Sequence, residues 1–308
     1  MRSFGRPDVL VLGGGGILGE AWMLAVLAGL EQETGLDLRE CEAFVGTSAG
    51  SIVAATLAAG RTPASRLGHV PEPPEPEPGD EARLAELLVG AALRAGQAAA
   101  GAASTLVPLV LRSTAPAGAL VRRAALSRVP RGQRSLSQLR DTIDRSGLYW
   151  DGRLRISAVE LESGRRVMFG APGAPRVSVG QAVQGSCAIP GVFRPVEAGG
   201  RTYVDGGAWS PTNMDAAPAG RGSHVLCLNP TGSMRPTREP PFGALGAISR
   251  SITAVEALAL QRRGARVMTV APDSASAAAM GANLMDAGPR AQVSAAGRAQ
   301  GRRLGHRS

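Results

Sequence analysis

Short apolar runs that stop at glycine or polar residues are the main pattern along this chain. Four of them have the length of a buried strand: Val9–Leu12, Ala43–Val45, Val225–Leu228 and Val267–Val270. Longer stretches follow the first two runs, over 19–34 and 51–59, and have helical spacing or small residues throughout. Strands that alternate with helices predict an α/β fold built on a parallel sheet.

The middle of the chain adds further elements to this pattern. They are a strand pair, a capped helix, a strand and a long helix, over Leu154–Leu161 with Arg166–Phe169, Ser178–Ser186, Thr202–Val204 and 242–263. Ser178 suits a helix N-cap, because its hydroxyl accepts a bond from a free backbone N–H. The strand at 202–204 leads directly into Asp205, Gly206 and Gly207.

Residues 61–150 interrupt the α/β pattern, and we predict that they form an insertion in a single domain spanning 1–308. The part from Pro71 to Pro78 contains only proline and glutamate, which is typical of a solvated linker. Residues 81–126 are rich in alanine and leucine, and 95–111 carry no charge. That stretch is shorter than the roughly 20 residues of a spanning helix. It predicts either a helical insertion packed on the core, which we favour, or a lid that touches lipid.

Charge narrows the range of partners. The chain of 308 residues has a formal net charge of +9, and all 34 of its basic residues are arginine. The absence of lysine is typical of a GC-rich coding sequence, but arginine also binds phosphate and carboxylate groups bidentately. No basic run is interleaved with aromatic residues, so we do not expect a nucleic-acid partner. Residues 290–308 contain five arginines and no acid, and we expect a solvated helix and a basic C-terminal tail there, with an anionic membrane surface as the minority alternative.

Cysteine usage and the N-terminus indicate the compartment. Cys41, Cys187 and Cys227 are too few and too scattered for a disulfide framework or a metal site. The four apolar residues Val9–Leu12 are too few for the core of a signal peptide. We therefore expect a cytoplasmic protein that contacts a membrane only peripherally, if at all. We expect it to use no metal ion and no organic cofactor.

The residues most suited to chemistry lie in two glycine motifs near the N-terminus. Gly46-Thr47-Ser48-Ala49-Gly50 has the G-x-S-x-G spacing of a sharp strand-to-helix turn with an exposed serine. The run Gly13–Gly16 offers unshielded backbone N–H groups that could hold an oxyanion. A simple turn at Ser48 is one alternative. Another is a nucleotide phosphate loop, although no acidic residue ends the second strand to bind a ribose.

These two motifs are followed along the chain by two further segments, and the four occur in the same order in a known family. Residues 14–19, 46–51, 186–196 and 205–207 together resemble the glycine-rich loop, the nucleophile motif, the internal Ser-x-Ala-x-Pro-x-x-Phe stretch and the aspartate motif of the patatin-like phospholipase family. The resemblance covers 9–213 and leaves most of 61–150 and the C-terminal third unmatched. It implies a three-layer α/β/α hydrolase that cleaves lipid acyl esters, of phospholipids or neutral lipids.

The resemblance also implies roles for individual residues. Ser48 would be the nucleophile and Asp205 the base of a catalytic dyad. The oxyanion hole would come from Gly14, Gly15 and Gly16. The supporting motif glycines would be Gly19, Gly46, Gly50, Gly206 and Gly207. The family commonly carries a basic residue at the position where this chain has Leu18, so we expect no additional cation at that position of the loop.

Two side chains leave alternatives open. Arg194 either lines the substrate site near a headgroup phosphate or belongs to a rigid proline-flanked connection. His224 follows Asp205, so the order of a Ser-Asp-His triad is formally present, yet His224 begins a predicted strand rather than a loop. The other histidines, His69 and His306, adjoin the Pro/Glu segment and the C-terminus. We therefore expect a dyad, with a triad esterase or a non-catalytic lipid- or protein-binding protein as the alternatives.

Overall fold

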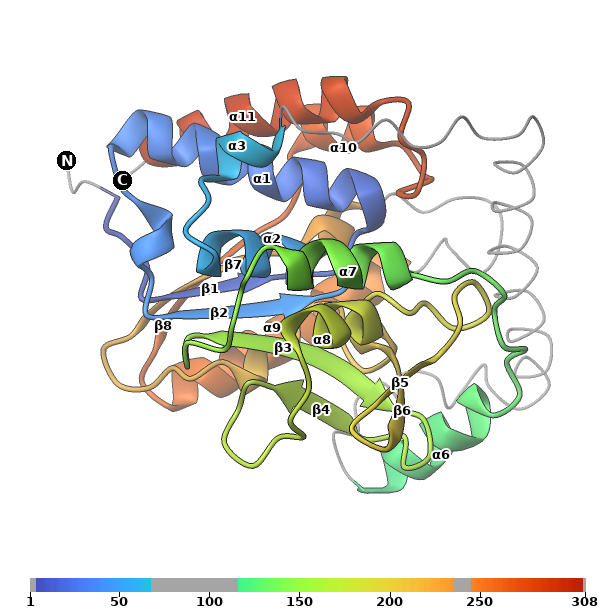
Figure 1. The fold of residues 1–308 in the computed structure, drawn as a ribbon. Coiled ribbons are helices and arrows are strands. Elements are labelled where there is room, and N and C mark those ends of the chain that lie inside the picture. The colour runs from blue at the N-terminus through green and yellow to red at the C-terminus, as the bar shows by residue number, and fades with distance from the viewer. Residues whose placement is uncertain (1–3, 68–115, 235–244, 307–308) are drawn as a thin grey trace.

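The computed structural model describes residues 4–67, 116–234 and 245–306 (Figure 1). Three expectations, for the Pro71–Pro78 linker, for the uncharged stretch 95–111 and for His69, lie outside these ranges. So does most of the segment 81–126. The structure describes this segment only from residue 116 onward.

A mixed sheet of eight strands forms the centre of the molecule, which confirms the predicted α/β class. Its strands are β1 Val9–Leu12, β2 Ala43–Thr47, β3 Leu154–Glu160, β4 Arg166–Phe169, β5 Val196–Ala198, β6 Arg201–Asp205, β7 His224–Leu228 and β8 Arg266–Val270. They lie in the order β5-β6-β3-β2-β1-β7-β8, and β4 pairs with β3. The neighbouring strands β3, β2, β1, β7 and β8 pair in parallel, whereas β4, β5 and β6 pair antiparallel with their neighbours.

Strand β3 holds two partners along one of its edges, and this arrangement positions the site. Strands β2 and β6 share that edge: β2 pairs in parallel up to Ser157, and β6 runs in the opposite direction and pairs from Ala158 onward. Strand β4 pairs with the opposite edge of β3, from Ile156 to Val159. The ends of β2 and β6 therefore meet at neighbouring positions of β3.

Helices flank both faces of the sheet. They are α1 Gly16–Thr34, α2 Ala49–Ala58, α3 Pro63–Leu67, α6 Pro116–Leu126, α7 Ser137–Arg145, α8 Val179–Ser186, α9 Leu245–Arg262, α10 Ser274–Met280 and α11 Arg290–His306. Helices α1, α2 and α8 pack on one face, with α3, α10 and α11 outside α1, and α9 covers the other face beside β8 (Figure 1). Two short 3₁₀ turns lie between β6 and β7, at Gly206–Ala208 and Met214–Ala216. Another follows β7, at Pro230–Ser233.

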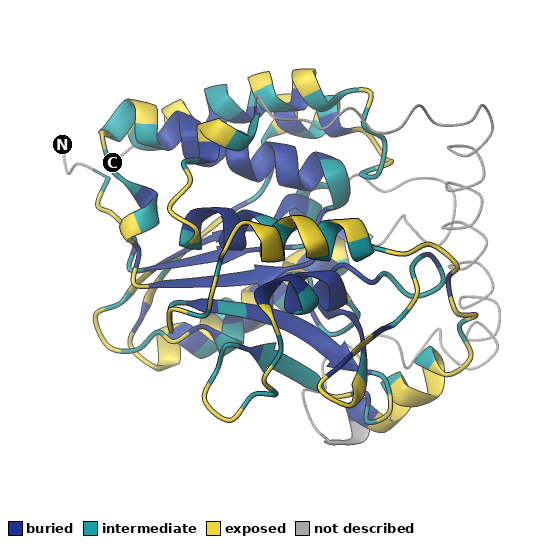
Figure 2. Cartoon of the chain, in the orientation of Figure 1, coloured by how far each residue is buried: buried dark blue, intermediate teal, exposed yellow. Residues whose placement is uncertain are grey.

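The core has two apolar layers, one on each face of the sheet. Alternate residues of β1 serve the two layers: Leu10 and Leu12 face α1 and α2, whereas Val9 and Val11 pack with residues of α9. Helix α1 begins three residues before its predicted start and is buried continuously from Leu18 to Leu30 (Figure 2). A helix that is apolar on every side must be covered on every side.

The cover over α1 is α11, which corrects the expectation of a basic C-terminal tail. The indole N–H of Trp22 donates to the side-chain oxygen of Gln300 at 2.9 Å, and both residues are buried. Gly297 and Gly301 let the two helix backbones approach closely, because a Cβ at Gly301 would overlap the carbonyl oxygen of Val26. Arg302 and Arg303 of α11 are exposed to solvent, and the expectation of a basic tail rested on the arginines without the glycine spacing.

The described end of the insertion consists of two helices. Helix α6 packs at Gly164, where its Ala119 is buried, and α7 packs against α8. Whether the insertion as a whole acts as a lid stays a prediction.

No helix within 4–67, 116–234 or 245–306 is both long enough and apolar enough to cross a membrane.

The contact between α1 and α11 predicts a large effect of one methyl group. Gly301→Ala should lower the free energy of unfolding by about 1–3 kcal/mol, because the overlap with Val26 outweighs the higher helix propensity of alanine. Urea unfolding measures this change. Ala295→Val on the exposed side of the same helix is the control and should cost less than about 1 kcal/mol. Wild-type stability in Gly301→Ala would show that the helices do not pack this closely.

Candidate active site

The motif around Ser48 forms a tight elbow between β2 and α2. Ser48 itself has φ 50° and ψ −123°, a strained conformation for a residue with a side chain. The turn demands glycine on both sides. A Cβ at Gly46 would lie 2.5 Å from the Cα of Ser51, and one at Gly50 would overlap the carbonyl oxygen of Leu12. The G-x-S-x-G spacing thus follows from two close backbone approaches.

The structure brings Ser48 and Asp205 together. The Oγ of Ser48 donates to the Oδ2 of Asp205 at 2.7 Å, although 157 residues separate them in sequence. Thr47, the last residue of β2, pairs with Ser157, and Asp205, the last residue of β6, pairs with Ala158. Two strands that approach along one edge of β3 therefore set the distance between these side chains.

The Asp205 carboxylate lies in a nearly dry environment. Its residue is 5% exposed, and burial raises its pKa to about 6. The hydrogen bonds from the Ser48 hydroxyl and from the backbone N–H of Gly207, which reaches Oδ1 at 2.7 Å, limit this rise. Gly206 packs so closely that a Cβ there would overlap the Oγ of Ser157. A carboxylate of this kind is a stronger base than an exposed aspartate.

A buried amide supports the end of both strands. The Nδ2 of Asn213 lies 3.1 Å from the Oγ1 of Thr47 and 3.2 Å from the Oγ of Ser157. The same amide donates to the carbonyl oxygens of Gly206 and Ser210. Asn213 has a positive φ of 51°, which asparagine tolerates better than most residues. The sequence analysis missed this residue, because one asparagine in a loop carries no pattern.

Helix α8 contributes a second support that the sequence analysis did not assign. The Oγ of Ser186, fully buried at the end of α8, accepts the backbone N–H of Ser48 at 2.9 Å. The next residue, Cys187, places its sulfur 3.8 Å from the Oγ of Ser51. Burial raises the pKa of the Cys187 thiol far above its usual range, so it stays protonated beside the elbow. The motif 186–196 contained Ser186, but its spacing gave no hint of this bond.

The glycine loop adjoins the elbow, and its N–H groups differ in availability. The Cα of Gly14 faces the Cβ of Ser48, but its N–H donates to the carbonyl of Pro211 at 2.8 Å. The Gly14 N–H is therefore not free in this conformation, and its place in an oxyanion hole stays a prediction. The N–H groups of Gly15 and Gly16 have no acceptor among the described residues, and the same holds for Ala49 at the start of α2.

The remaining residues of that loop are structural. Gly19 lies in α1 beside the ring of Pro230, and Leu18 is fully buried. The N–H of Leu18 donates to the carbonyl of Leu284. No cation stands at position 18, as the sequence indicates.

Of the histidines that the structure describes, neither His224 nor His306 reaches this site, which excludes a triad through His224. His224 is the first residue of β7, and β7 pairs in parallel with β1, so His224 lies at the opposite end of the strands from Leu228 and Leu12. Its ring lies near Arg266 on the surface. His306 pairs with Glu33 at the ends of α11 and α1.

Arg194 lies on the surface, and neither of its predicted roles is decided. Its side chain is exposed, and its backbone N–H donates to the carbonyl of Arg134 at 2.9 Å.

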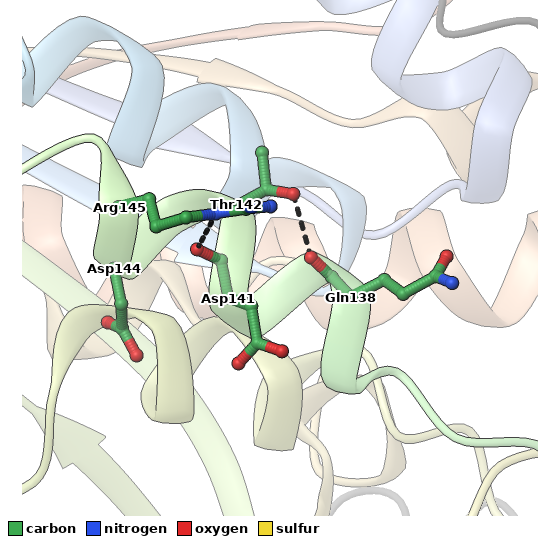
Figure 3. A pocket seen from close by; sticks show the side chains of 5 residues that line it. All are labelled: Gln138, Asp141, Thr142, Asp144 and Arg145. Atoms are coloured by element: carbon green, nitrogen blue, oxygen red, sulfur yellow. Dashed lines mark hydrogen bonds between the residues drawn. The ribbon is translucent and has the colours of Figure 1, made fainter.

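A surface hollow occurs along α7, away from the elbow (Figure 3). Its lining side chains all belong to this one helix: Gln138, Asp141, Thr142, Asp144 and Arg145. The bonds drawn there run to carbonyls one turn back in the same helix. This hollow does not contact Ser48 or Asp205, and we assign no substrate to it. Within the described ranges, no group of three or more His, Cys, Asp or Glu side chains is arranged to hold a metal ion.

Comparison with known proteins identifies the family whose motifs the chain carries. Residues 10–72 and 155–218 match the model of the patatin-like phospholipase family. The two matched segments contain Ser48 and Asp205, so the resemblance found in the motifs is confirmed. No curated protein matched the sequence.

Solved structures with a similar course of the chain include VipD and ExoU. VipD from Legionella pneumophila is 16% identical, with a TM-score of 0.43, and the match covers 99% of this chain and 68% of VipD. The type III effector ExoU is 16% identical, with a TM-score of 0.40 and coverage of 99% and 54%. ExoU in its complex with SpcU, from Pseudomonas aeruginosa, is 23% identical, with a TM-score of 0.32. That match covers 84% of this chain and 53% of the ExoU–SpcU chain. The present chain thus spans about half to two-thirds of the length of these neighbours, and likeness at this level does not bear on activity.

The burial of Asp205 predicts a pH-dependent reactivity of Ser48. Labelling of Ser48 by a fluorophosphonate should slow as the pH falls through about 6, because only the carboxylate form of Asp205 accepts the Ser48 proton. The rate of labelling across a pH series measures the midpoint. Asp205→Asn should label slowly at every pH. A midpoint near the ordinary aspartate value of about 4 would contradict the buried environment.

Proposed function

We propose that this chain is a serine hydrolase that cleaves lipid acyl esters through a Ser48–Asp205 dyad. The observation that carries the proposal is the 2.7 Å hydrogen bond from the Ser48 hydroxyl to a buried carboxylate whose pKa is raised to about 6. A hydroxyl, a base within hydrogen-bond reach and a strained elbow are the parts that an activated serine needs. The match to the patatin-like phospholipase family supports lipid esters as the substrate class.

The acylation step uses the carboxylate of Asp205 directly. As the Oγ of Ser48 attacks the ester carbonyl carbon, its proton moves to Oδ2 of Asp205. The carbonyl oxygen then carries a negative charge, and the free N–H groups of Gly15, Gly16 and Ala49 are the candidates to bind it. The tetrahedral intermediate collapses, and the leaving alcohol takes the proton from Asp205. Ser48 is left acylated.

Deacylation repeats these roles with water. Asp205 accepts a proton from water, whose oxygen attacks the acyl carbon. Collapse of the second intermediate returns the proton to Oγ of Ser48 and releases the fatty acid. The bond from the Gly207 N–H to Oδ1 leaves Oδ2 free to face the reacting oxygen in both steps. This route calls for no metal ion or organic cofactor.

Release of fatty acid from a panel of phospholipids and neutral lipids tests the proposal. Wild-type protein should hydrolyse at least one of them, and Ser48→Ala should lose several orders of magnitude in kcat while keeping its fold. A wild-type protein that neither hydrolyses lipid nor reacts with a fluorophosphonate would be the non-catalytic binding protein instead.

The dyad predicts losses that do not add. Asp205→Asn keeps the shape of the side chain and removes the proton acceptor, so its loss in kcat should approach that of Ser48→Ala. The double variant should be little worse than either single variant, because the two residues act as one unit. Additive losses in kcat would show that Asp205 does not serve Ser48.

The glycine loop offers a variant with a matched control. Gly16 and Gly35 have φ of 60° and 69°, so an alanine at either position introduces a similar backbone strain. Only Gly16 belongs to the loop beside Ser48, and a Cβ there would lie 2.7 Å from the carbonyl oxygen of Leu284. Gly16→Ala should lower kcat about 100-fold, since losing one oxyanion donor costs about 3 kcal/mol. Gly35→Ala should keep the wild-type kcat; equal kcat in both would exclude the loop from catalysis.

A further inference from the structure

A strongly basic segment adjoins the candidate active site. Residues 116–140 contain six arginines and no acidic residue. Helix α6 and the residues after it present four of these arginines to solvent: Arg123, Arg128, Arg131 and Arg134. None of the four forms an ion pair with a residue that the structure describes. Their positive charge is therefore not neutralised by such a pair.

Two large apolar side chains of α6 are also exposed to solvent. Leu120 is 65% exposed and Val121 is 48% exposed, whereas Ala119 beside them is buried against the core. We call Leu120, Val121 and the four arginines the α6 patch. Much of α6 is coloured as exposed in Figure 2. Apolar side chains among arginines suit the interfacial region of a bilayer, where acyl chains and anionic headgroups meet.

One end of the segment is fixed to the loop that follows Asp205. The Nε of Arg122 donates to the carbonyl of Ala208 at 3.1 Å, and its guanidinium lies 4.1 Å from the centroid of the Trp209 ring. Ala208 and Trp209 are three and four residues after the candidate base. The helix also lies at the end of the sheet where β3 terminates (Figure 1). The α6 patch thus has a fixed position relative to Asp205.

The other end is fixed to the loop that follows α8. Gly132 lies so close to Val192 that a Cβ would overlap its backbone, and Arg134 bridges to Phe193. The loop begins at Ala188, whose carbonyl accepts the N–H of Asp205 at 2.9 Å. The exposed Arg194 lies next to Arg134 through its backbone bond. The basic segment therefore contacts both loops that hold Asp205.

The arginines of α11 have a different setting. Helix α11 lies outside α1, and its Arg303 is paired with Asp273. The sequence analysis considered this C-terminal segment for membrane contact, but the structure shows it as a packing helix. The arginines beside the candidate site are those of the α6 patch.

We propose that the α6 patch docks the protein on an anionic lipid bilayer, with the Ser48–Asp205 site toward the membrane. Arginine guanidinium groups bind phosphate in a bidentate manner, and Leu120 and Val121 enter the interface between them. The inference rests on the proposed lipid substrate, because it assigns the surface through which that substrate is met. The charge of the patch selects anionic over zwitterionic membranes.

Vesicle co-sedimentation with the Ser48→Ala protein tests the docking surface without consuming the lipid. One vesicle contains phosphatidylcholine alone, and the other contains two parts phosphatidylcholine to one part phosphatidylglycerol. The test variant carries Arg123→Gln, Arg128→Gln and Arg131→Gln. The control carries Arg221→Gln, Arg262→Gln and Arg302→Gln, which removes the same charge at exposed positions elsewhere.

The expected result is binding to the anionic vesicles that weakens at high salt. The test variant should lose on the order of 100-fold in partition coefficient, since each arginine near the surface contributes about fivefold. The control should lose much less. Leu120→Gln should also weaken binding, and Val255→Gln, at a residue 62% exposed on α9, should not. Equal losses in the two arginine variants, or equal binding to both vesicles, would overturn the proposal.

A soluble short-chain ester separates this proposal from the proposed function. With Ser48 intact, the arginine test variant should hydrolyse such an ester at the wild-type rate and hydrolyse anionic vesicles more slowly. A wild-type protein that hydrolyses neither the soluble ester nor any lipid of the panel would refute the proposed function and leave the vesicle-binding result to decide the docking surface. Equal slowing on both substrates would show that the three arginines act on the site itself, and would refute their role in docking.

Discussion

The contact between the Ser48 hydroxyl and the Asp205 carboxylate is the interaction on which the site depends. The two groups come from strands that pair with adjacent residues of β3, so the sheet itself sets their separation. Close backbone packing surrounds them, because Gly50 and Gly206 leave no room for a side chain between neighbouring elements. Such packing excludes water, and the exclusion of water gives the carboxylate its raised pKa.

Burial of a carboxylate is unfavourable unless its oxygens find donors. Here one oxygen accepts from Ser48 and the other from the N–H of Gly207. Asn213 fixes the turn that carries the Gly207 donor, and Ser186 fixes the backbone of the candidate nucleophile, Ser48. The same arrangement that offsets the cost of burial also holds Asp205 at the distance needed for proton transfer. The stability of this site and its proposed reactivity rest on the same hydrogen bonds.

The resemblance to the patatin-like family pointed to Asp205 as the base, whereas local patterns in the sequence predicted the elbow at Ser48 and every strand except β5. These features follow from short-range rules, such as apolar runs ended by glycine and the steric demand of a sharp turn. The meeting of β2 and β6 on one edge of β3 could not be predicted, because strand register depends on the whole sheet. Asn213 and Ser186 act through tertiary hydrogen bonds and have no periodic signal. The packing of α11 was missed because its polar composition outweighed the two glycines that contact α1.

The central claim is that Ser48 carries the acyl group during turnover. Rapid acid quenching of the protein with an activated ester, followed by peptide mass spectrometry, tests it directly. The account predicts an acyl mass increment on the peptide that contains Ser48. The increment should accumulate within one turnover and be absent from Ser48→Ala. An acyl adduct on Cys187 or on any other residue, with Ser48 unmodified, would contradict the account.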